Sequence, residues 1–168
     1  MYFHGAVEKL SRSSRTSFAS KLHSLSENEE EVEIGTYDCS GKKEFWLVAQ
    51  QYIEKANVVI LFFDLTDRRS FTSLKRREMN ELKKKKEFRR KDKIFAIVGT
   101  KLDLIDDVGV EREVSKMEAS FLAGKHECLY FESRGDAYSV GDVMEKVVRC
   151  IFEANSSSGS NSELSDIN

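Results

Sequence analysis

The chain has 168 residues, 40% of them hydrophobic and 33% charged, which predicts one globular domain with a charged surface. Its formal net charge of −2 argues against general nucleic-acid binding, which needs a basic surface. No apolar run approaches the roughly 18 residues of a membrane-spanning helix, and the three cysteines favour a reducing cytoplasm over a disulfide framework.

Strand and helix patterns alternate from the start of the chain. Residues 1–7, "MYFHGAV", form a weak strand pattern, and Ser14–Leu25, "SRTSFASKLHSL", form a helical one. Polar and apolar residues alternate over Glu31–Asp38, which is typical of a half-exposed strand. The apolar spacing of Phe45–Ala56 predicts a helix.

The rest of the chain continues the alternation. Three short apolar runs are typical of buried parallel strands: Asn57–Phe63, Lys93–Gly99 and Cys128–Glu132. Helices are predicted at Ser70–Phe88 (apolar stripe Phe71, Leu74, Met79 and Leu82), Ser115–Lys125 and Val140–Asn155. The polar, Ser-rich residues 155–168 predict a disordered tail, which leaves a domain over residues 1–154.

Strand–helix alternation with short connections predicts an α/β fold, in which helices cover both faces of a mostly parallel sheet. Ligands bind such sheets outside the carboxyl ends of the strands. The polar segments that follow the strands are therefore the candidate sites: "KLSRSSRTSF", "DCSGKKEF", "GTKLD" and "ESRGD".

The order of these motifs resembles the Ras superfamily of small GTPases. The matching segments are "SRSSRTSF" for the phosphate loop, "DCSGKKEF" for switch II, "VVILFFDLTDRRSF" for a Rab-type strand and helix start, "VGTKLDL" for the [NT]KxD guanine motif, and "YFESRGD" for YxETSAK. The resemblance covers the chain to about Asn155. It implies a three-layer P-loop NTPase-like fold with GTP or GDP and Mg²⁺ as ligands.

Lys101 and Asp103 suit a guanine base on chemical grounds. The two carboxylate oxygens of Asp103 match the two adjacent N–H donors of guanine, a pair that adenine does not offer. The aliphatic stem of Lys101 can cover one face of the base. The alternative is an exposed charged loop. The resemblance implies nucleotide contacts from Thr100, Lys101, Asp103, Leu104, Arg134 and Gly135.

The switch II resemblance assigns Asp38 to the water shell of Mg²⁺ and the Gly41 N–H to the γ-phosphate. Lys42 stands where the family has the glutamine that positions the attacking water. Lysine only donates hydrogen bonds and cannot accept one from that water, so no catalytic residue is assigned. The alternative for Asp38 and Gly41 is an ordinary Asp-initiated turn.

The phosphate loop departs from its pattern. Lys9 and Ser14 replace two glycines that let backbone N–H groups converge on phosphates, and Arg15 replaces the lysine. Thr16 keeps the hydroxyl that suits Mg²⁺, and the start of the helix predicted at Ser14–Leu25, with Ser11, Ser13 or Ser14 as its cap, would offer free N–H groups. The resemblance thus implies nucleotide contacts from Ser14, Arg15, Thr16 and Ser17. A capped helix start without phosphate is the alternative.

Only the 22 residues 16–37 separate Arg15 from Asp38. The family places switch I and a further antiparallel strand there, and the sequence shows neither. We therefore expect a sheet short of one strand, with five parallel strands and Glu31–Asp38 as its unpaired edge. A real loss and a truncated gene model both account for such a gap.

The resemblance favours a divergent Rab-like GTP-binding protein that regulates vesicle traffic or signalling and hydrolyses GTP slowly, if at all. The alternative is a pseudo-GTPase scaffold without a nucleotide cycle. Expected partners are a guanine nucleotide and protein effectors or regulators, but no nucleic acid. The basic run Lys83–Lys93 favours anionic lipid, an acidic partner or a solvated helix end. Without a C-terminal cysteine for prenylation, we expect a cytoplasmic protein, peripheral at membranes.

Overall fold

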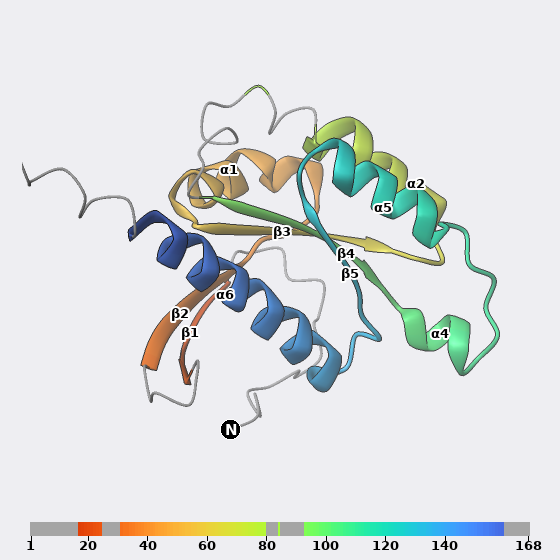
Figure 1. Ribbon diagram of the computed structural model, residues 1–168. Coiled ribbons are helices and arrows are strands. Elements are labelled where there is room, and N and C mark those ends of the chain that lie inside the picture. Colours follow the sequence, from red (N-terminus) through yellow and green to blue (C-terminus); the bar gives the residue numbers. More distant parts are fainter. Residues whose placement is uncertain (1–16, 25–30, 80–83, 85–92, 160–168) are drawn as a thin grey trace, which may run out of the picture. The chain divides into compact units, whose positions relative to one another are not determined.

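The computed structural model describes residues 17–24, 31–79, 84 and 93–159, which Figure 1 draws in colour. The chain divides into two compact units, one within Gly5–Ala56 and the other within Asn57–Asn168. Each unit is described on its own. The predicted strand at residues 1–7 lies outside the described residues.

The first unit contains an antiparallel hairpin. Strand β1 (Ser17–Ser24) pairs with β2 (Glu31–Asp38) along its whole length, with Ser17 opposite Asp38 and Ser24 opposite Glu31. The predicted helix at Ser14–Leu25 is therefore wrong. Also wrong is the expectation that an antiparallel strand is lacking and that β2 is the unpaired edge of five parallel strands, because β2 pairs antiparallel with β1.

A short helical segment follows the hairpin. The turn η1 (Lys43–Phe45) leads into α1 (Trp46–Lys55), which confirms the helix predicted at Phe45–Ala56. Ala49 of α1 is buried. The rings of Tyr37 and Tyr52 lie 4.5 Å apart, centroid to centroid, so α1 contacts the carboxyl end of β2.

The second unit is built on a parallel sheet. Strands β3 (Val58–Asp64), β4 (Ile94–Thr100) and β5 (Leu129–Glu132) lie in the order β3–β4–β5. Asp64 pairs in register with Thr100, and Gly99 pairs with Glu132. The carboxyl ends of all three strands therefore meet at one edge of the sheet. The three predicted parallel strands are confirmed, but only β4 is buried along most of its length, and no residue of β5 is fully buried.

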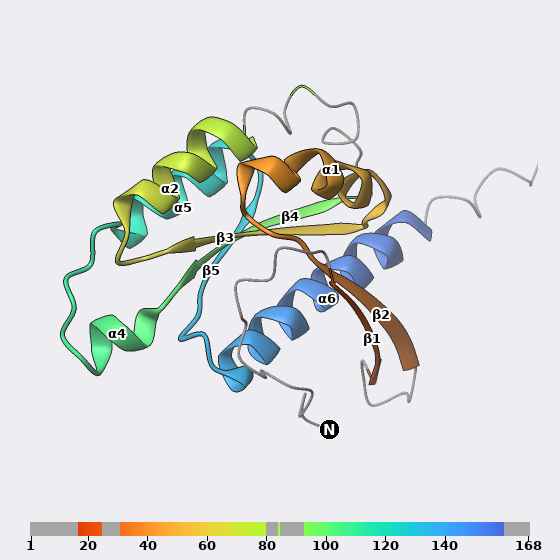
Figure 2. The same ribbon diagram turned by 180° about the vertical axis from the view of Figure 1, so that it is seen from behind.

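Helices cover both faces of this sheet (Figure 2). On one face, Phe71 of α2 (Arg68–Ser73), Leu74 of the π-helical turn η2 (Leu74–Glu78) and Leu122 of α5 (Lys116–Lys125) pack in one buried cluster. On the other, Val143 and Val147 of α6 (Ala137–Gly159) pack on Ala96 and Val98. The three-layer α/β architecture is confirmed.

The predicted apolar stripe is buried at Phe71, Leu74 and Met79, whereas Leu82 lies outside the described residues. One short helix was not predicted: α4 (Leu102–Asp106), directly after β4. Helix α6 continues to Gly159, so the first five residues of the expected tail are helical. None of the described helices is both long enough and apolar enough to cross a lipid bilayer.

Candidate functional site

Hydrogen bonds beyond the sheet register join the ends of β3 and β4. The Leu65 amide donates to the Thr100 carbonyl (3.1 Å), and the Thr100 hydroxyl donates to the Phe63 carbonyl (3.0 Å). The Thr100 side chain, predicted to contact nucleotide, thus contributes to the frame of the site. These bonds place the residues after β3 beside those after β4.

The ends of β4 and β5 are joined in the same way through Ser133. Its amide donates to the Gly99 carbonyl (2.8 Å), and its carbonyl accepts from the Leu102 amide (3.2 Å). Its side chain is buried, with its hydroxyl 3.0 Å from that of Ser139. The "TKLD" and "ESRGD" segments therefore lie side by side, as parallel strand ends predict.

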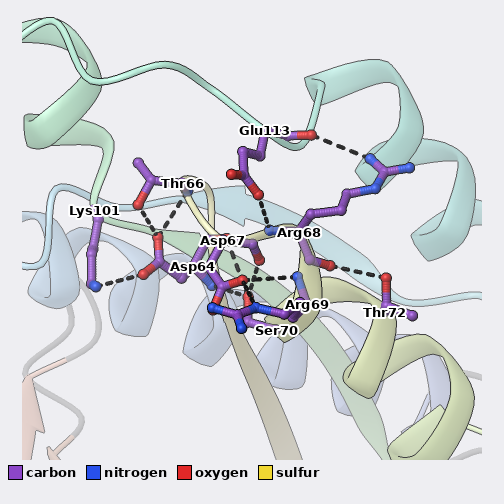
Figure 3. A network of polar contacts seen from close by, with 9 residues as sticks. All are labelled: Asp64, Thr66, Asp67, Arg68, Arg69, Ser70, Thr72, Lys101 and Glu113. Atoms are coloured by element: carbon purple, nitrogen blue, oxygen red, sulfur yellow. Dashed lines mark hydrogen bonds and ion pairs between the residues drawn. The ribbon is translucent and has the colours of Figure 1, made fainter.

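Lys101 turns the chain from β4 into α4. Its backbone is left-handed, with φ 66° and ψ 33°, a conformation that costs a residue with a side chain about 1–2 kcal/mol. The Leu104 amide donates to the Lys101 carbonyl (3.2 Å). The turn aims the Lys101 side chain back across the sheet edge, where its Nζ lies 2.5 Å from Oδ2 of Asp64 (Figure 3).

Asp64 is a site residue that the sequence reading missed. Its other oxygen, Oδ1, accepts hydrogen bonds from the Thr66 amide (2.8 Å) and the Thr66 hydroxyl (2.7 Å). Burial by itself raises the pKa of Asp64, but the bonds from Lys101 and Thr66 outweigh it, and the pKa lies below its ordinary value. Asp64 directly follows the third predicted strand, so the same rule that places ligand sites after strand ends also points to it.

Asp103 lies in the first turn of α4 and is partly exposed. Its backbone carbonyl accepts from the Asp107 amide (2.9 Å). Its carboxylate makes no hydrogen bond or ion pair with any residue that the structure describes. Both oxygens of the Asp103 carboxylate therefore remain available as hydrogen-bond acceptors. Two such oxygens suit the two adjacent N–H groups of guanine.

Comparison with known proteins identifies the family. A family model described as "Ras: Ras family" matches residues 8–153. The chain belongs to the Ras family. Among its relatives it is 30% identical over 115 residues to Ras-related protein R-Ras of Rattus norvegicus, a match that covers 68% of this chain and 50% of that protein.

Two further relatives show the breadth of the match. The chain is 32% identical over 123 residues to GTP-binding protein Rit1 of Mus musculus (73% of this chain, 53% of that protein). It is 29% identical over 106 residues to Ras-related protein Rab-30 of Homo sapiens (63% and 48%). The chain spans about half the length of these curated relatives.

In this Ras-family chain, Arg134 forms ion pairs with two aspartates at the end of α4. It stands at a serine of the YxETSAK pattern, and its guanidinium reaches across to α4. Nη1 lies 3.2 Å from Oδ2 of Asp106, and Nη2 pairs with Asp107. The bond to Asp107 and its charge raise the pKa of Arg134. The side chain predicted to contact nucleotide thus ties the β5–α6 loop to α4.

Gly135 is held in its own turn. Its φ is +81°, in the left-handed region that glycine adopts without a side-chain penalty. Its amide, which the resemblance assigns to the guanine oxygen, donates to the Ser133 hydroxyl (3.1 Å). A base bound here would replace or share that hydrogen bond.

The phosphate-side residues of this Ras-family chain belong to the other unit. Asp38 ends β2 and is exposed, Gly41 is exposed, and the Lys42 carbonyl accepts from the Phe45 amide (3.0 Å). Ser17 begins a strand, so the helix start on which its predicted phosphate contact depends is not found there. Ser14, Arg15 and Thr16 lie outside the described residues.

The described residues fit Mg²⁺ only in part. They contain no group of three or more histidine, cysteine, aspartate or glutamate side chains that could hold a metal ion. Protein sites for Mg²⁺ in nucleotide-binding proteins commonly supply one or two side chains and leave the remaining positions to phosphates and water. Asp38 can hold one of the water molecules bound to Mg²⁺, and Thr16, the predicted direct ligand, lies outside the described residues.

Proposed function

We propose that this Ras-family chain binds a guanine nucleotide at the carboxyl edge of β3–β4–β5. The observation that carries the proposal is the Asp103 carboxylate, which has no hydrogen-bond or ion-pair partner among the described residues and lies in the first turn of α4, close to Lys101 in the chain. Bidentate, charge-assisted bonds to guanine would satisfy both of its oxygens. Adenine would leave them without donors, which is costly in a partly buried site.

We further propose a regulatory role of the Rab type, in vesicle traffic or signalling. Relatives named Rab-30 and Rab-2B support it, as does the Rab-like segment that forms β3 and the start of α2. With phosphates bound, Asp38 and Thr16 would hold Mg²⁺, which supplies charge neutralisation to the phosphate groups. Lys42 lacks an acceptor for the attacking water, so turnover is slow at best.

A pseudo-GTPase scaffold is the second candidate, and a separate observation favours it. Ser17 lies in β1 rather than at a helix start, so the described residues offer no helix N-terminus to phosphates at that position. In this case the chain would bind protein partners through its surface and have no nucleotide cycle.

For location, we propose a cytoplasmic protein that meets membranes peripherally, through protein effectors or regulators or through the basic run Lys83–Lys93. Only Lys84 and Lys93 of that run are among the described residues. Attraction of such a run to anionic headgroups fades once the Debye length shrinks to a few ångströms, as it does near 1 M salt.

The test is direct identification of the ligand. Protein purified without added nucleotide is denatured, the released small molecules are identified by mass spectrometry, and the emptied protein is titrated with GDP and ADP in parallel, with and without Mg²⁺. We expect GDP or GTP in the released fraction and a clear preference for GDP over ADP. No released nucleotide and no GDP binding would leave the scaffold candidate in its place.

A further inference from the structure

The Asp64 carboxylate, at the end of β3, is held on both of its oxygens. It receives the Thr66 amide and hydroxyl on one oxygen and the Lys101 ammonium on the other (Figure 3). Only 18% of the Asp64 side chain is exposed, compared with 53% of Lys101. The aspartate is thus the fixed member of the pair, and the lysine is the member that would otherwise move.

The turn that carries Asp64 is itself braced. The Asp64 amide donates to the Ser70 hydroxyl (2.9 Å), and that hydroxyl also donates to the Asp67 carbonyl (2.7 Å). Asp67 caps α2 by accepting from the Arg69 amide (2.9 Å). The carboxylate of Asp64 therefore sits on a structured strand end and helix start.

A second brace comes from the loop before α5. The Arg68 amide donates to a carboxylate oxygen of Glu113 (2.5 Å), and Arg68 Nη2 donates to Glu118 of α5 (2.7 Å). The Glu113 amide in turn donates to the Leu65 carbonyl (3.0 Å). The residues on both sides of Asp64 are thus held by neighbouring segments.

Lys101 is fixed at both of its ends as a result. Its Cα is set by the left-handed turn and by the hydrogen bond between Leu102 and Ser133, and its Nζ is set by Asp64. The four-carbon stem between these points therefore spans from the end of β4 to the end of β3, just before α4, which carries Asp103. Lysine loses much rotamer freedom when it is ordered, and here that ordering precedes any ligand.

We propose that Asp64 is a positioning residue for base recognition: by holding the Lys101 ammonium, it presents the lysine stem as a preformed apolar cover for one face of a guanine base. This inference rests on the proposed nucleotide-binding function and assigns a role to a residue outside the guanine motif. Asp64 also compensates the positive charge of the Lys101 ammonium, so Lys101 contacts the base rather than the phosphates.

The experiment measures dissociation constants for GDP and for a non-hydrolysable GTP analogue. The variants are Asp64→Asn, the control Asp67→Asn from the same turn, and both again in a Lys101→Met background, which keeps an apolar stem and removes the ammonium. Asp64→Asn should weaken both ligands by about tenfold, the size expected for ordering one long side chain upon binding. Asp67→Asn should change them by less than about twofold.

The Lys101→Met background separates positioning from folding. There, Asp64→Asn should have less than about a twofold effect, because its partner is gone. A persistent tenfold loss would show a merely structural role and overturn the proposal. A gain in affinity for the triphosphate over GDP would overturn it too, since the freed ammonium would then be serving phosphates.

The lysine can also be observed without ligand. In nucleotide-free protein, the Lys101 ammonium should give a slowly exchanging NMR signal that Asp64→Asn abolishes and Asp64→Glu partly restores. Absence of that signal in the unmutated protein overturns the positioning role alone. Failure of the unmutated protein to bind either nucleotide, with the signal present, overturns the proposed function and with it the role in base recognition.

Discussion

Arg112, in the loop before α5, donates two parallel hydrogen bonds to Glu132 at the end of β5, one of 3.0 Å and one of 2.9 Å. The pair is largely shielded from water, with 27% of the Arg112 side chain and 13% of the Glu132 side chain exposed. The Tyr130 hydroxyl donates a third bond to Glu132 (2.6 Å). This cluster holds the end of β5, from which the chain continues through Ser133 into the β5–α6 loop.

Arg112→Met should therefore destabilise the fold. It leaves the Glu132 carboxylate without its charge partner, and we expect a loss of about 2 kcal/mol in unfolding free energy, less than for a fully buried pair. The measurement is urea unfolding at pH 7. Arg149→Met, which removes an exposed pair with Glu145 on α6, is the control and should cost no more than about 0.5 kcal/mol. Equal losses in the two variants would contradict the assignment.

Glu132 also predicts an acid limit to stability. Burial raises its pKa, but hydrogen bonds from Arg112 and Tyr130 outweigh burial, so the folded pKa lies below the ordinary value of 4.5. The unfolded chain therefore takes up the proton first, and stability falls as the pH drops below about 4.5 toward the folded pKa. Unfolding midpoints between pH 7 and 3 should decline less steeply in Glu132→Gln than in the unmutated protein.

Gly99 permits the close packing of β4 on β3. A Cβ at this position would lie 2.6 Å from Cδ2 of the fully buried Leu65 and 3.1 Å from the ring of Phe63. Gly99→Ala should cost about 1–3 kcal/mol of stability, as overpacked cores do. Gly124→Ala in α5, where a Cβ would meet nothing within 4 Å, should instead stabilise by up to about 1 kcal/mol. Thermal or urea unfolding of both variants measures these two opposite changes in stability.

Arg134 should matter mainly at low salt. Its two ion pairs with Asp106 and Asp107 are exposed, and exposed charges are screened as ionic strength rises. Arg134→Ser should loosen the β5–α6 loop, seen as faster hydrogen exchange of the Gly135 amide in 50 mM salt. The difference from the unmutated protein should vanish near 1 M salt. A difference that is independent of salt would indicate packing rather than charge.

Asp103 should determine base selectivity. Asp103→Ala is expected to cost about 2–4 kcal/mol of GDP binding, because it removes two charge-assisted bonds, and to leave ADP binding unchanged. Asp106→Ala, on the same short helix, is the control and should keep the preference for guanine. Calorimetric titration with both nucleotides measures this. Equal affinity of the unmutated protein for GDP and ADP would refute the role.

Lys42 offers a test of turnover. We expect the unmutated protein to hydrolyse bound GTP at or below about 10⁻⁴ s⁻¹. Lys42→Gln supplies an acceptor for the attacking water and should raise the single-turnover rate, whereas Lys42→Ala, which removes the ammonium alone, should not. Equal rates in the two variants would show that Lys42 does not lie at the water-positioning place.

The hairpin shows where sequence reasoning was insufficient. Phe18 and Leu22 are four residues apart, a spacing that puts two side chains on the same side of a helix and also on the same side of a strand. Local periodicity could not separate the two. Pairing of β1 along the whole of β2 decided for the strand, because it satisfies backbone groups that an isolated β2 would leave exposed at an edge.

By itself, the sequence determined the strands from Asn57 onward and most of the helices between them, but not α4, and it placed the "TKLD" segment at the carboxyl edge of these strands. The strands are written as short apolar runs and the helices as apolar stripes, and both patterns can be recognised from local composition and spacing. Only the tertiary structure decided the pairing of Lys101 with Asp64 and the reach of Arg134 to α4. Each of these contacts joins segments far apart in the chain. These segments meet only because parallel strands bring their carboxyl ends to one edge of the sheet, where oppositely charged side chains form ion pairs.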